Sequence, residues 1–178
     1  MRIIAGEAKG RRLETPPDGT RPLTGKAREA LFSILGDAVT GAAVLDLYAG
    51  SGSFGLEALS RGAADVLFVE RDPQAVSVLR GNVEAIDLGG RIEAVDVESY
   101  LGRSSQTFDV VFVDPPWALG DIAVDRILTR VEPLVDQDGI VVIHRRAGGG
   151  EPASDNLRLT DRRRYGDTEL WLYAKEGA

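Results

Sequence analysis

Cysteine is absent from the 178 residues of the chain. This absence excludes disulfide bonds, thiolate nucleophiles and cysteine-ligated zinc or iron–sulfur sites. Histidine occurs once, at His144, so a polyhistidine metal site is excluded and a Ser-His-Asp triad would have to use that residue. We therefore predict a protein without a metal site.

Long apolar stretches are also missing. No run approaches the ~20 residues that a membrane-spanning helix needs. The first residues, MRIIAGEAKGRRLE, lack the apolar core of a secretory signal. We expect a cytoplasmic protein that makes no membrane contact, and we expect it to act as a monomer.

The net charge of −7 argues against bulk electrostatic attraction to nucleic acid. The distribution of charge is uneven, because residues 1–36 carry seven Lys/Arg and only four Asp/Glu. This segment is therefore basic, and the remainder of the chain is strongly acidic. Such an asymmetry marks a segment that faces a polyanion, although a basic surface exposed only to solvent has the same pattern.

After Thr40, apolar segments alternate with helical patterns, which predicts a parallel sheet covered by helices on both faces. The predicted parallel strands are AAVLDLY, DVLFVE, IEAVDV, FDVVFVD and GIVVIH. The last two predicted strands, LRLTDRRRY and ELWLYAKE, are too close together in the chain to be parallel. The sequence therefore predicts an α/β fold whose mostly parallel sheet ends in an antiparallel hairpin.

Residues 1–38 are predicted to form a small N-terminal appendage, and residues 39–178 the main domain. The segments RIIAG and RRLET flank a polar turn, which predicts a hairpin. A helix follows, with Thr24 as its N-cap and Gly36 just past its end. Its apolar residues recur at helical spacing, namely Ala27, Ala30, Leu31, Ile34 and Leu35.

Three glycines follow the first predicted strand of the main domain. Gly50, Gly52 and Gly55 form a G-x-G-x-x-G pattern between that strand and a helix. The pattern allows a tight turn, close approach of the backbone to a ligand, and N–H donors at a helix N-terminus. NAD enzymes share it, and a βα turn without a ligand would show it too, so the glycines alone do not identify a ligand.

Acidic residues narrow the choice of ligand. Asp46 lies four residues before Gly50, where a second anion would repel a pyrophosphate. Glu70 ends the second predicted strand, and a carboxylate there can accept both hydroxyl protons of a ribose. S-adenosylmethionine has a ribose, an ammonium group and a sulfonium but no phosphate, so these acids favour it over NAD. Asp96, after the third strand, is predicted to accept a hydrogen bond from the adenine amino group.

The fourth strand runs into the sequence Asp114-Pro115-Pro116-Trp117. Open α/β sheets bind ligands at the carboxyl ends of their strands, so this segment should lie beside the cofactor. Asp114 and the carbonyl of Pro115 can accept the two hydrogens of an exocyclic amine and orient its lone pair toward a methyl donor. The prolines stiffen the loop, and Trp117 offers a face on which a base can stack. In isolation, the same residues could equally form a strand-ending turn with a core tryptophan.

Several longer stretches resemble the RsmD-like family, the 16S ribosomal RNA guanine-N2 methyltransferases. The resemblance covers nearly the whole chain. It rests on MRIIAGEAKGRRLETP, TRPLTGKAREALFSIL, VLDLYAGSGSFGLEALSRGA, FVERD, FDVVFVDPPW and YGDTELWLY. The N-terminal signature and GLEALSRGA are specific to the family, whereas all class I methyltransferases share the glycine turn.

The resemblance implies a seven-stranded class I methyltransferase fold that binds S-adenosylmethionine. It implies a substrate as well, one guanine of 16S RNA in an assembling small ribosomal subunit. The implied catalytic loop is Asp114 to Trp117. We assign to the cofactor site Asp46, Tyr48, Gly50, Ser51, Gly52, Glu70, Arg71, Asp96 and Val97. We assign to RNA binding Arg11, Arg12, Arg21, Thr24 and Arg28, with the arginines on phosphates rather than base edges.

Two other functions stay open at this point. One is methylation of adenine N6 in RNA or DNA, because DPPW is the form found in messenger-RNA adenosine N6-methyltransferases, whereas the RsmD-like family usually has Tyr or Phe at Trp117. The other is a non-catalytic RNA-binding assembly factor on the same fold. An intact glycine turn and an intact DPPW argue against the second. The family often has an acidic residue after strand five, where this chain has HRRAGGG, and we interpret His144 as a structural or surface residue.

Overall fold

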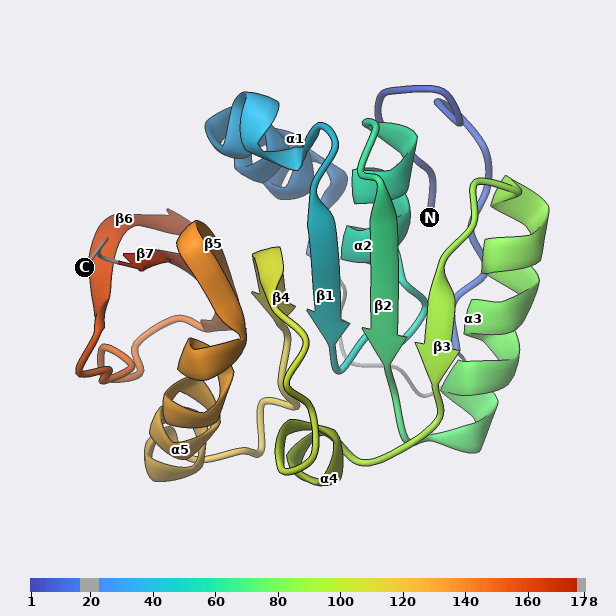
Figure 1. Cartoon of the computed structure of the whole chain (residues 1–178). Coiled ribbons are helices and arrows are strands. Elements are labelled where there is room, and N and C mark those ends of the chain that lie inside the picture. Colours follow the sequence, from blue (N-terminus) through green and yellow to red (C-terminus); the bar gives the residue numbers. More distant parts are fainter. Residues whose placement is uncertain (17–22, 176–178) are drawn as a thin grey trace.

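The computed structural model describes residues 1–16 and 23–175 (Figure 1). Its strands form one seven-stranded sheet in the order β3-β2-β1-β4-β5-β7-β6. The strands are β1 (Ala43–Leu47), β2 (Asp65–Val69), β3 (Arg91–Glu93), β4 (Phe108–Val113), β5 (Val135–Arg146), β6 (Leu157–Tyr165) and β7 (Thr168–Lys175). Strands β1 to β5 pair in parallel, and β7 pairs antiparallel with both β5 and β6. The predicted sheet is therefore confirmed, including its C-terminal hairpin.

Helices cover both faces of this sheet. They are α1 (Gly25–Leu35), α2 (Ser53–Ser60), α3 (Pro73–Ile86), α4 (Val97–Leu101) and α5 (Asp121–Val131), with short 3₁₀ turns η1 (Gly36–Val39) and η2 (Glu132–Leu134). Helices α1, α2 and α3 contribute to one buried apolar cluster, and α4 and α5 to the other. No helix in the described part of the chain is long and apolar enough to cross a membrane.

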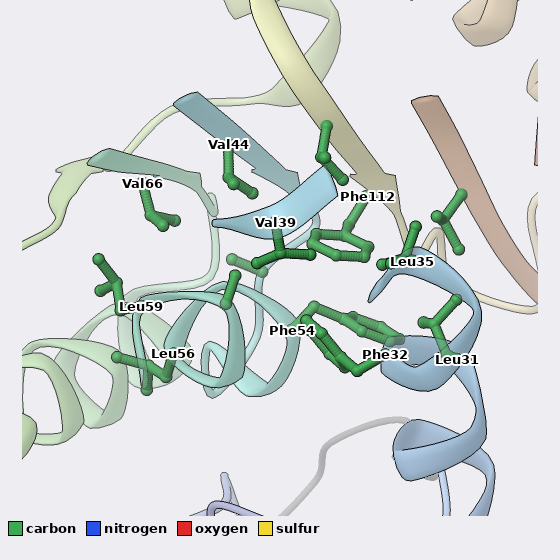
Figure 2. Close-up of a cluster of buried hydrophobic side chains, with 14 of the residues drawn as sticks. Leu31, Phe32, Leu35, Val39, Val44, Phe54, Leu56, Leu59, Val66 and Phe112 are labelled. Atoms are coloured by element: carbon green, nitrogen blue, oxygen red, sulfur yellow. The ribbon is translucent and has the colours of Figure 1, made fainter. Parts of the chain in front are cut away.

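The period of two along each strand produces these two clusters. In β1, Val44 belongs to the cluster under α1 to α3, whereas its neighbour Leu45 belongs to the cluster under α4 and α5. Figure 2 shows the first cluster, in which Phe54 stacks on Phe112 with ring centroids 5.1 Å apart. Phe32 of α1 lies 5.8 Å from the same Phe112 ring. The helix after the N-terminal arm is therefore packed into the core of the sheet.

The predicted helix at the N-terminus is confirmed. The hydroxyl of Thr24 accepts a hydrogen bond from the N–H of Ala27 at 3.3 Å, and Gly36 has a φ of 51°, a conformation that favours glycine. The predicted third strand is shorter than expected. It ends at Glu93, and Asp96 instead caps α4 by accepting from the N–H groups of Glu98 and Ser99.

The predicted N-terminal hairpin is wrong in its extent. One antiparallel bridge joins Arg2 and Arg12, and the flanking backbone hydrogen bonds run from Ile3 to Arg11 at 3.0 Å and from Leu13 to Met1 at 2.9 Å. The backbone N–H groups of Ile4 and Ala5 donate to the carboxylate of Glu57 on α2, at 2.8 and 3.1 Å, instead of to a partner strand. A side chain of the main domain therefore takes the hydrogen bonds that a longer hairpin would need.

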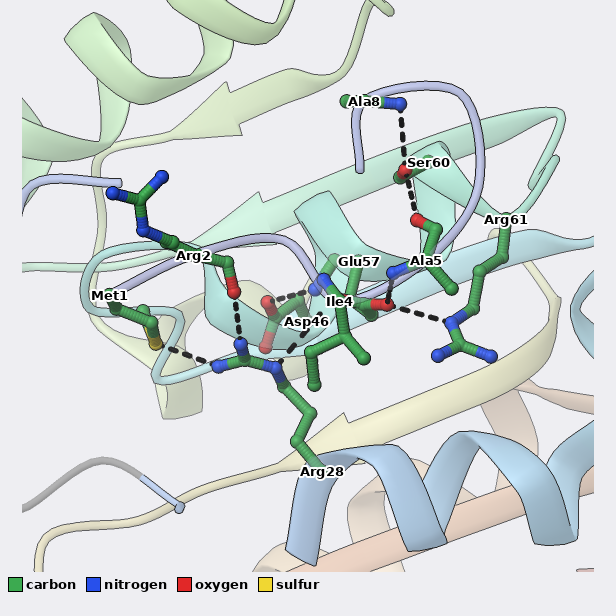
Figure 3. Close-up of polar contacts among 11 residues, drawn as sticks. Met1, Arg2, Ile4, Ala5, Ala8, Arg28, Asp46, Glu57, Ser60 and Arg61 are labelled. Atoms are coloured by element: carbon green, nitrogen blue, oxygen red, sulfur yellow. Dashed lines mark hydrogen bonds and ion pairs between the residues drawn. The ribbon is translucent and has the colours of Figure 1, made fainter. Parts of the chain in front are cut away.

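Glu57 is the centre of a buried polar network (Figure 3). Its side chain is 0% exposed, and Arg61 donates to it at 2.8 Å. Arg28 of α1 forms a longer ion pair with it, at 3.8 Å, and donates to the carbonyl of Arg2 at 2.5 Å. One carboxylate thus joins the N-terminal arm, α1 and α2.

Replacement of Glu57 by alanine should destabilise the protein by about 3–5 kcal/mol, because it leaves the buried Arg28 without its counter-charge and two partly buried N–H groups without an acceptor. Urea denaturation followed by circular dichroism measures this loss. Glu84→Ala, at an exposed position on α3, is the control and should change stability by less than about 0.5 kcal/mol. Equal effects of the two substitutions would show that the network does not stabilise the fold.

Candidate active site

A cavity of about 740 Å³ opens at the carboxyl ends of β1, β2 and β4. Seven of the residues that the sequence assigned to the cofactor site or the catalytic loop line it, namely Tyr48, Gly50, Glu70, Arg71, Val97, Asp114 and Pro116. They come from four separate segments of the chain, which the parallel strands bring to one edge of the sheet. The position of this cavity agrees with the place where open α/β sheets bind ligands.

The three glycines of the turn have different environments. Gly50 has a φ of 55° and lines the cavity, and an added Cβ would meet only the carbonyl oxygen of Tyr48, at 3.9 Å. A Cβ on Gly52 would lie 2.5 Å from Leu79, and one on Gly55 would lie 2.3 Å from Phe68. The second and third glycines are therefore required by packing against α3 and β2. The first leaves open space at the cavity wall.

Glu70 holds the turn from the end of β2. One carboxylate oxygen accepts from the N–H of Gly50 at 2.9 Å. The other accepts from the N–H groups of Arg71 and Asp72, each at 2.8 Å. A carboxylate offers about four lone-pair positions, so one remains for a hydroxyl group in the cavity.

Asp46, within β1, is 1% exposed, and its Oδ2 accepts from the N–H of Gly55 at 2.9 Å. Its Oδ1 is buried and has no hydrogen-bond partner among the described residues. Burial raises the pKa of Asp46 well above its usual range, and the nearby charges of Asp114 and Glu70 raise it further. A buried acceptor without a partner is costly, and a donor from a ligand would relieve that cost.

Of the other predicted cofactor residues, Tyr48 and Arg71 line the cavity, whereas Ser51 and Asp96 are not among its lining residues. Tyr48 has a φ of 59°, and burial raises the pKa of its phenol to about 12. Arg71 and Asp96 form an ion pair at 3.0 Å. Ser51 is buried, and its carbonyl accepts from the side chain of Asn82 at 2.9 Å. Ser51 therefore joins the glycine turn to α3.

The segment Asp114 to Trp117 leaves the end of β4 directly at the cavity. The N–H of Asp114 donates to the carbonyl of Leu47 at 3.3 Å, which fixes the start of the loop beside β1. Pro115 is buried, Pro116 is exposed at the cavity wall, and Trp117 is half-buried. The Trp117 ring therefore keeps part of its surface open to solvent.

Sequence reasoning missed five residues that line the cavity, namely Pro16, Asp72, Pro73, Gln74 and Ala75. It also missed His144. Its Nδ1 lies 2.8 Å from Oδ1 of Asp114, so our interpretation of His144 as a structural or surface residue overlooked a contact with the catalytic loop. The contact follows from register, because β4 and β5 pair Val113 with Ile143, which places the next residue of each strand side by side. That neighbourhood could have been inferred from the predicted order of parallel strands.

One of the residues predicted to bind RNA, Arg28, was assigned wrongly. Its guanidinium is 2% exposed and paired with Glu57, so it cannot reach an RNA phosphate. Arg12 and Thr24 are exposed, and Arg11 is exposed but donates to the carbonyls of Ala85 and Ile86 at the end of α3. Arg21 lies outside the described residues.

Nearly the whole length of the chain matches one protein family. The model of that family, described as Conserved hypothetical protein 95, matches residues 1–174. The chain belongs to this family. A relative named ribosomal RNA small subunit methyltransferase D, from Escherichia coli strain K12, is 32% identical over 99% of this chain and 90% of its own length. The Bacillus subtilis relative, provisionally named the rRNA methyltransferase YlbH, is 33% identical over 99% of this chain and its own full length.

Solved structures agree with this family assignment. A provisionally named methyltransferase from Escherichia coli, yhhF, superimposes with a TM-score of 0.90 at 32% identity, covering 100% of this chain and 99% of its own. A hypothetical protein from Thermus superimposes with a TM-score of 0.85 at 35% identity, covering 97% of this chain and 98% of its own. The resemblance to the RsmD-like methyltransferases and the class I methyltransferase fold are therefore confirmed.

Proposed function

We propose that the chain transfers a methyl group from S-adenosylmethionine to the exocyclic N2 amine of one guanine in 16S ribosomal RNA. The observation that carries the proposal is the convergence of Asp114, Gly50 and Glu70 on one cavity. The relatives named as ribosomal RNA small subunit methyltransferases support the reaction class and the RNA substrate. We further propose that the substrate is an assembling small subunit and that the enzyme acts as a monomer.

The residues present fit S-adenosylmethionine. Oδ1 of Asp46 has no partner among the described residues, so it can accept a hydrogen bond, direct or indirect, from the cationic methionine moiety. The open space at Gly50 allows close approach of a ligand. The remaining lone pair at Glu70 suits a ribose hydroxyl, and Asp96 is proposed to accept from the adenine amine. A solved methyltransferase of the same fold, SMU.776, holds S-adenosylhomocysteine, although at 15% identity it supports the fold alone. When bound, the cofactor supplies an electrophilic methyl group.

Asp114 is proposed to orient the acceptor amine. The lone pair of an exocyclic amine is delocalised into the base, so the nitrogen must pyramidalise before it can attack a methyl group. Asp114 and the carbonyl of Pro115 can accept the two amine hydrogens, which holds the lone pair in line. As positive charge develops on the nitrogen, the carboxylate stabilises it, and the methylated nitrogen then loses one of its two hydrogens as a proton to solvent water.

Incubation of the purified chain with labelled S-adenosylmethionine and unmodified 16S RNA, free or in small-subunit particles, tests the proposal. We expect nuclease digestion to release labelled N2-methylguanosine. Labelled N6-methyladenosine would instead support the alternative that the sequence DPPW raises. Absence of label from every RNA substrate would contradict both proposals.

The structure narrows the surface proposed to bind RNA phosphates. We expect Arg12→Ala to reduce the slope of log K against log salt by roughly 0.7–0.9, since it removes one phosphate contact from an exposed position. Arg28→Ala should leave the slope unchanged and lower thermal stability, because Arg28 is buried against Glu57. Filter binding at several salt concentrations measures both. If Arg28→Ala reduced the slope and Arg12→Ala did not, Arg28 rather than Arg12 would contact an RNA phosphate.

A further inference from the structure

The end of β5 holds the catalytic loop in place. His144 contacts Asp114, the first residue of the loop, through Nδ1 and Oδ1 at 2.8 Å. Arg145, the next residue, donates to the carbonyl of Leu119 at 3.2 Å and forms an ion pair with Asp121 at 2.7 Å. The strand end therefore contacts the loop where it begins and where it leads into α5.

The surroundings of His144 define its hydrogen-bonding state. The side chain is 2% exposed, whereas that of Asp114 is 21% exposed. The other ring nitrogen, Nε2, is buried and has no hydrogen-bond partner among the described residues. An N–H there would be a buried donor without an acceptor, so the neutral ring with its proton on Nδ1 is favoured. In this tautomer, Nδ1–H donates to Asp114.

The hydrogen bond restricts the Asp114 carboxylate to one orientation. Oδ1 is paired with His144, and Asp114 lines the cavity. We therefore infer that Oδ2 is the oxygen that accepts from a substrate. A carboxylate on a loop would otherwise rotate about its Cβ–Cγ bond, and fixing it beforehand removes that freedom before the reaction begins. The Phe54 ring lies edge-on to His144, with centroids 6.2 Å apart, and helps to fix the plane of the imidazole.

We propose that His144 is a positioning residue for methyl transfer: its neutral Nδ1–H holds the Asp114 carboxylate in the orientation that receives the acceptor amine. The proposal rests on the proposed function for its kinetic part. It assigns a role to a residue that is absent from the cavity lining and acts through its contact with Asp114.

The tautomer can be measured directly, because His144 is the only histidine in the chain and gives a single set of imidazole signals. In protein labelled with ¹⁵N-histidine, we expect the nitrogen shifts of a neutral ring protonated at Nδ1. In Asp114→Ala the proton should move toward Nε2, the site that free imidazole side chains prefer. A wild-type ring protonated at Nε2 alone would overturn the proposal, whatever the substrate of the enzyme is.

Single-turnover methyl transfer tests the role in the reaction. His144→Phe should lower the rate by roughly 10- to 100-fold, the loss typical in metal sites when a residue that orients a metal ligand is removed. KM for the RNA and cofactor affinity should stay unchanged. His144→Asn should recover most of the rate, because its side-chain amide places an N–H near the position of Nδ1. Equal loss in both variants would overturn the proposal, since the donor would then not matter.

Leu170→Val is the matched control for packing. Leu170 pairs with His144 in register on β7 and is fully buried, but it carries no hydrogen-bonding group. This variant should lower the melting temperature and leave the rate of methyl transfer unchanged. A rate loss like that of His144→Phe would assign the effect to packing and overturn the proposal. A wild-type protein that transfers no methyl group would overturn the proposed function and the kinetic role together, whereas the tautomer would still report the contact.

Discussion

Asp114→Ala is expected to reduce kcat for methyl transfer by roughly 10²- to 10³-fold, the loss typical when a preorganised polar group is removed from a reaction centre. The carboxylate matters most when charge develops on the amine nitrogen, so its loss should appear in the chemical step rather than in binding. Asp114 lies at the cavity wall and, among the described residues, forms no hydrogen bond with Gly50 or Glu70. Calorimetry should therefore find cofactor affinity nearly unchanged.

Two controls accompany this variant. A melting curve separates lost chemistry from lost structure, because Asp114→Ala also removes the partner of the buried His144. Trp117→Phe, three residues along the same loop, should keep most of the activity, since a ring face for stacking survives. Near-normal turnover by a folded Asp114→Ala protein would contradict the catalytic role of the loop and would support the alternative hypothesis of a non-catalytic assembly factor.

Gly50→Val is expected to abolish detectable binding of S-adenosylmethionine. The backbone at Gly50 has a φ of 55°, which β-branched side chains resist. Among the described residues, the only atom within 4 Å of an added Cβ is the carbonyl oxygen of Tyr48, so the valine side chain would occupy the cavity rather than pack into the core. Calorimetry should show micromolar-range binding by the wild type, no binding by the variant, and no binding of NAD by either.

Gly81→Val is the matched control for this substitution. Gly81 lies in α3 with open space around an added Cβ, so valine there should leave cofactor affinity unchanged and the fold intact. Binding of NAD by the wild type would contradict the cofactor assignment. Wild-type affinity in a folded Gly50→Val protein would show that the cofactor does not approach the turn.

The cavity was predictable from the sequence because its parts share a physical cause. Asp46, Glu70 and Asp114 each follow or end an apolar segment, and parallel strands bring those ends to one edge. The glycine turn marks the strand-to-helix junction by its conformation. Local patterns, together with the rule that parallel strands end at one edge of a sheet, are therefore enough to predict that these residues lie close together.

The errors concern contacts that local patterns do not encode. Arg28 was assigned to RNA by its charge, although it lies three and four residues before Leu31 and Phe32 and so shares the buried face of α1. Its spacing indicated burial, but its partner, Glu57, lies on another helix. The hairpin is shorter than predicted for the same reason, since Glu57 accepts the N–H groups of Ile4 and Ala5 from 53 and 52 residues away.

The nucleosides of 16S RNA test the central claim most directly. In a strain that lacks the gene for this chain, mass mapping of digested 16S RNA should show the loss of one N2-methylguanosine, with every other modification retained. Expression of the wild-type chain should restore it, and expression of Asp114→Ala should not. Retention of every N2-methylguanosine in the deletion strain, or loss of an N6-methyladenosine instead, would contradict the account.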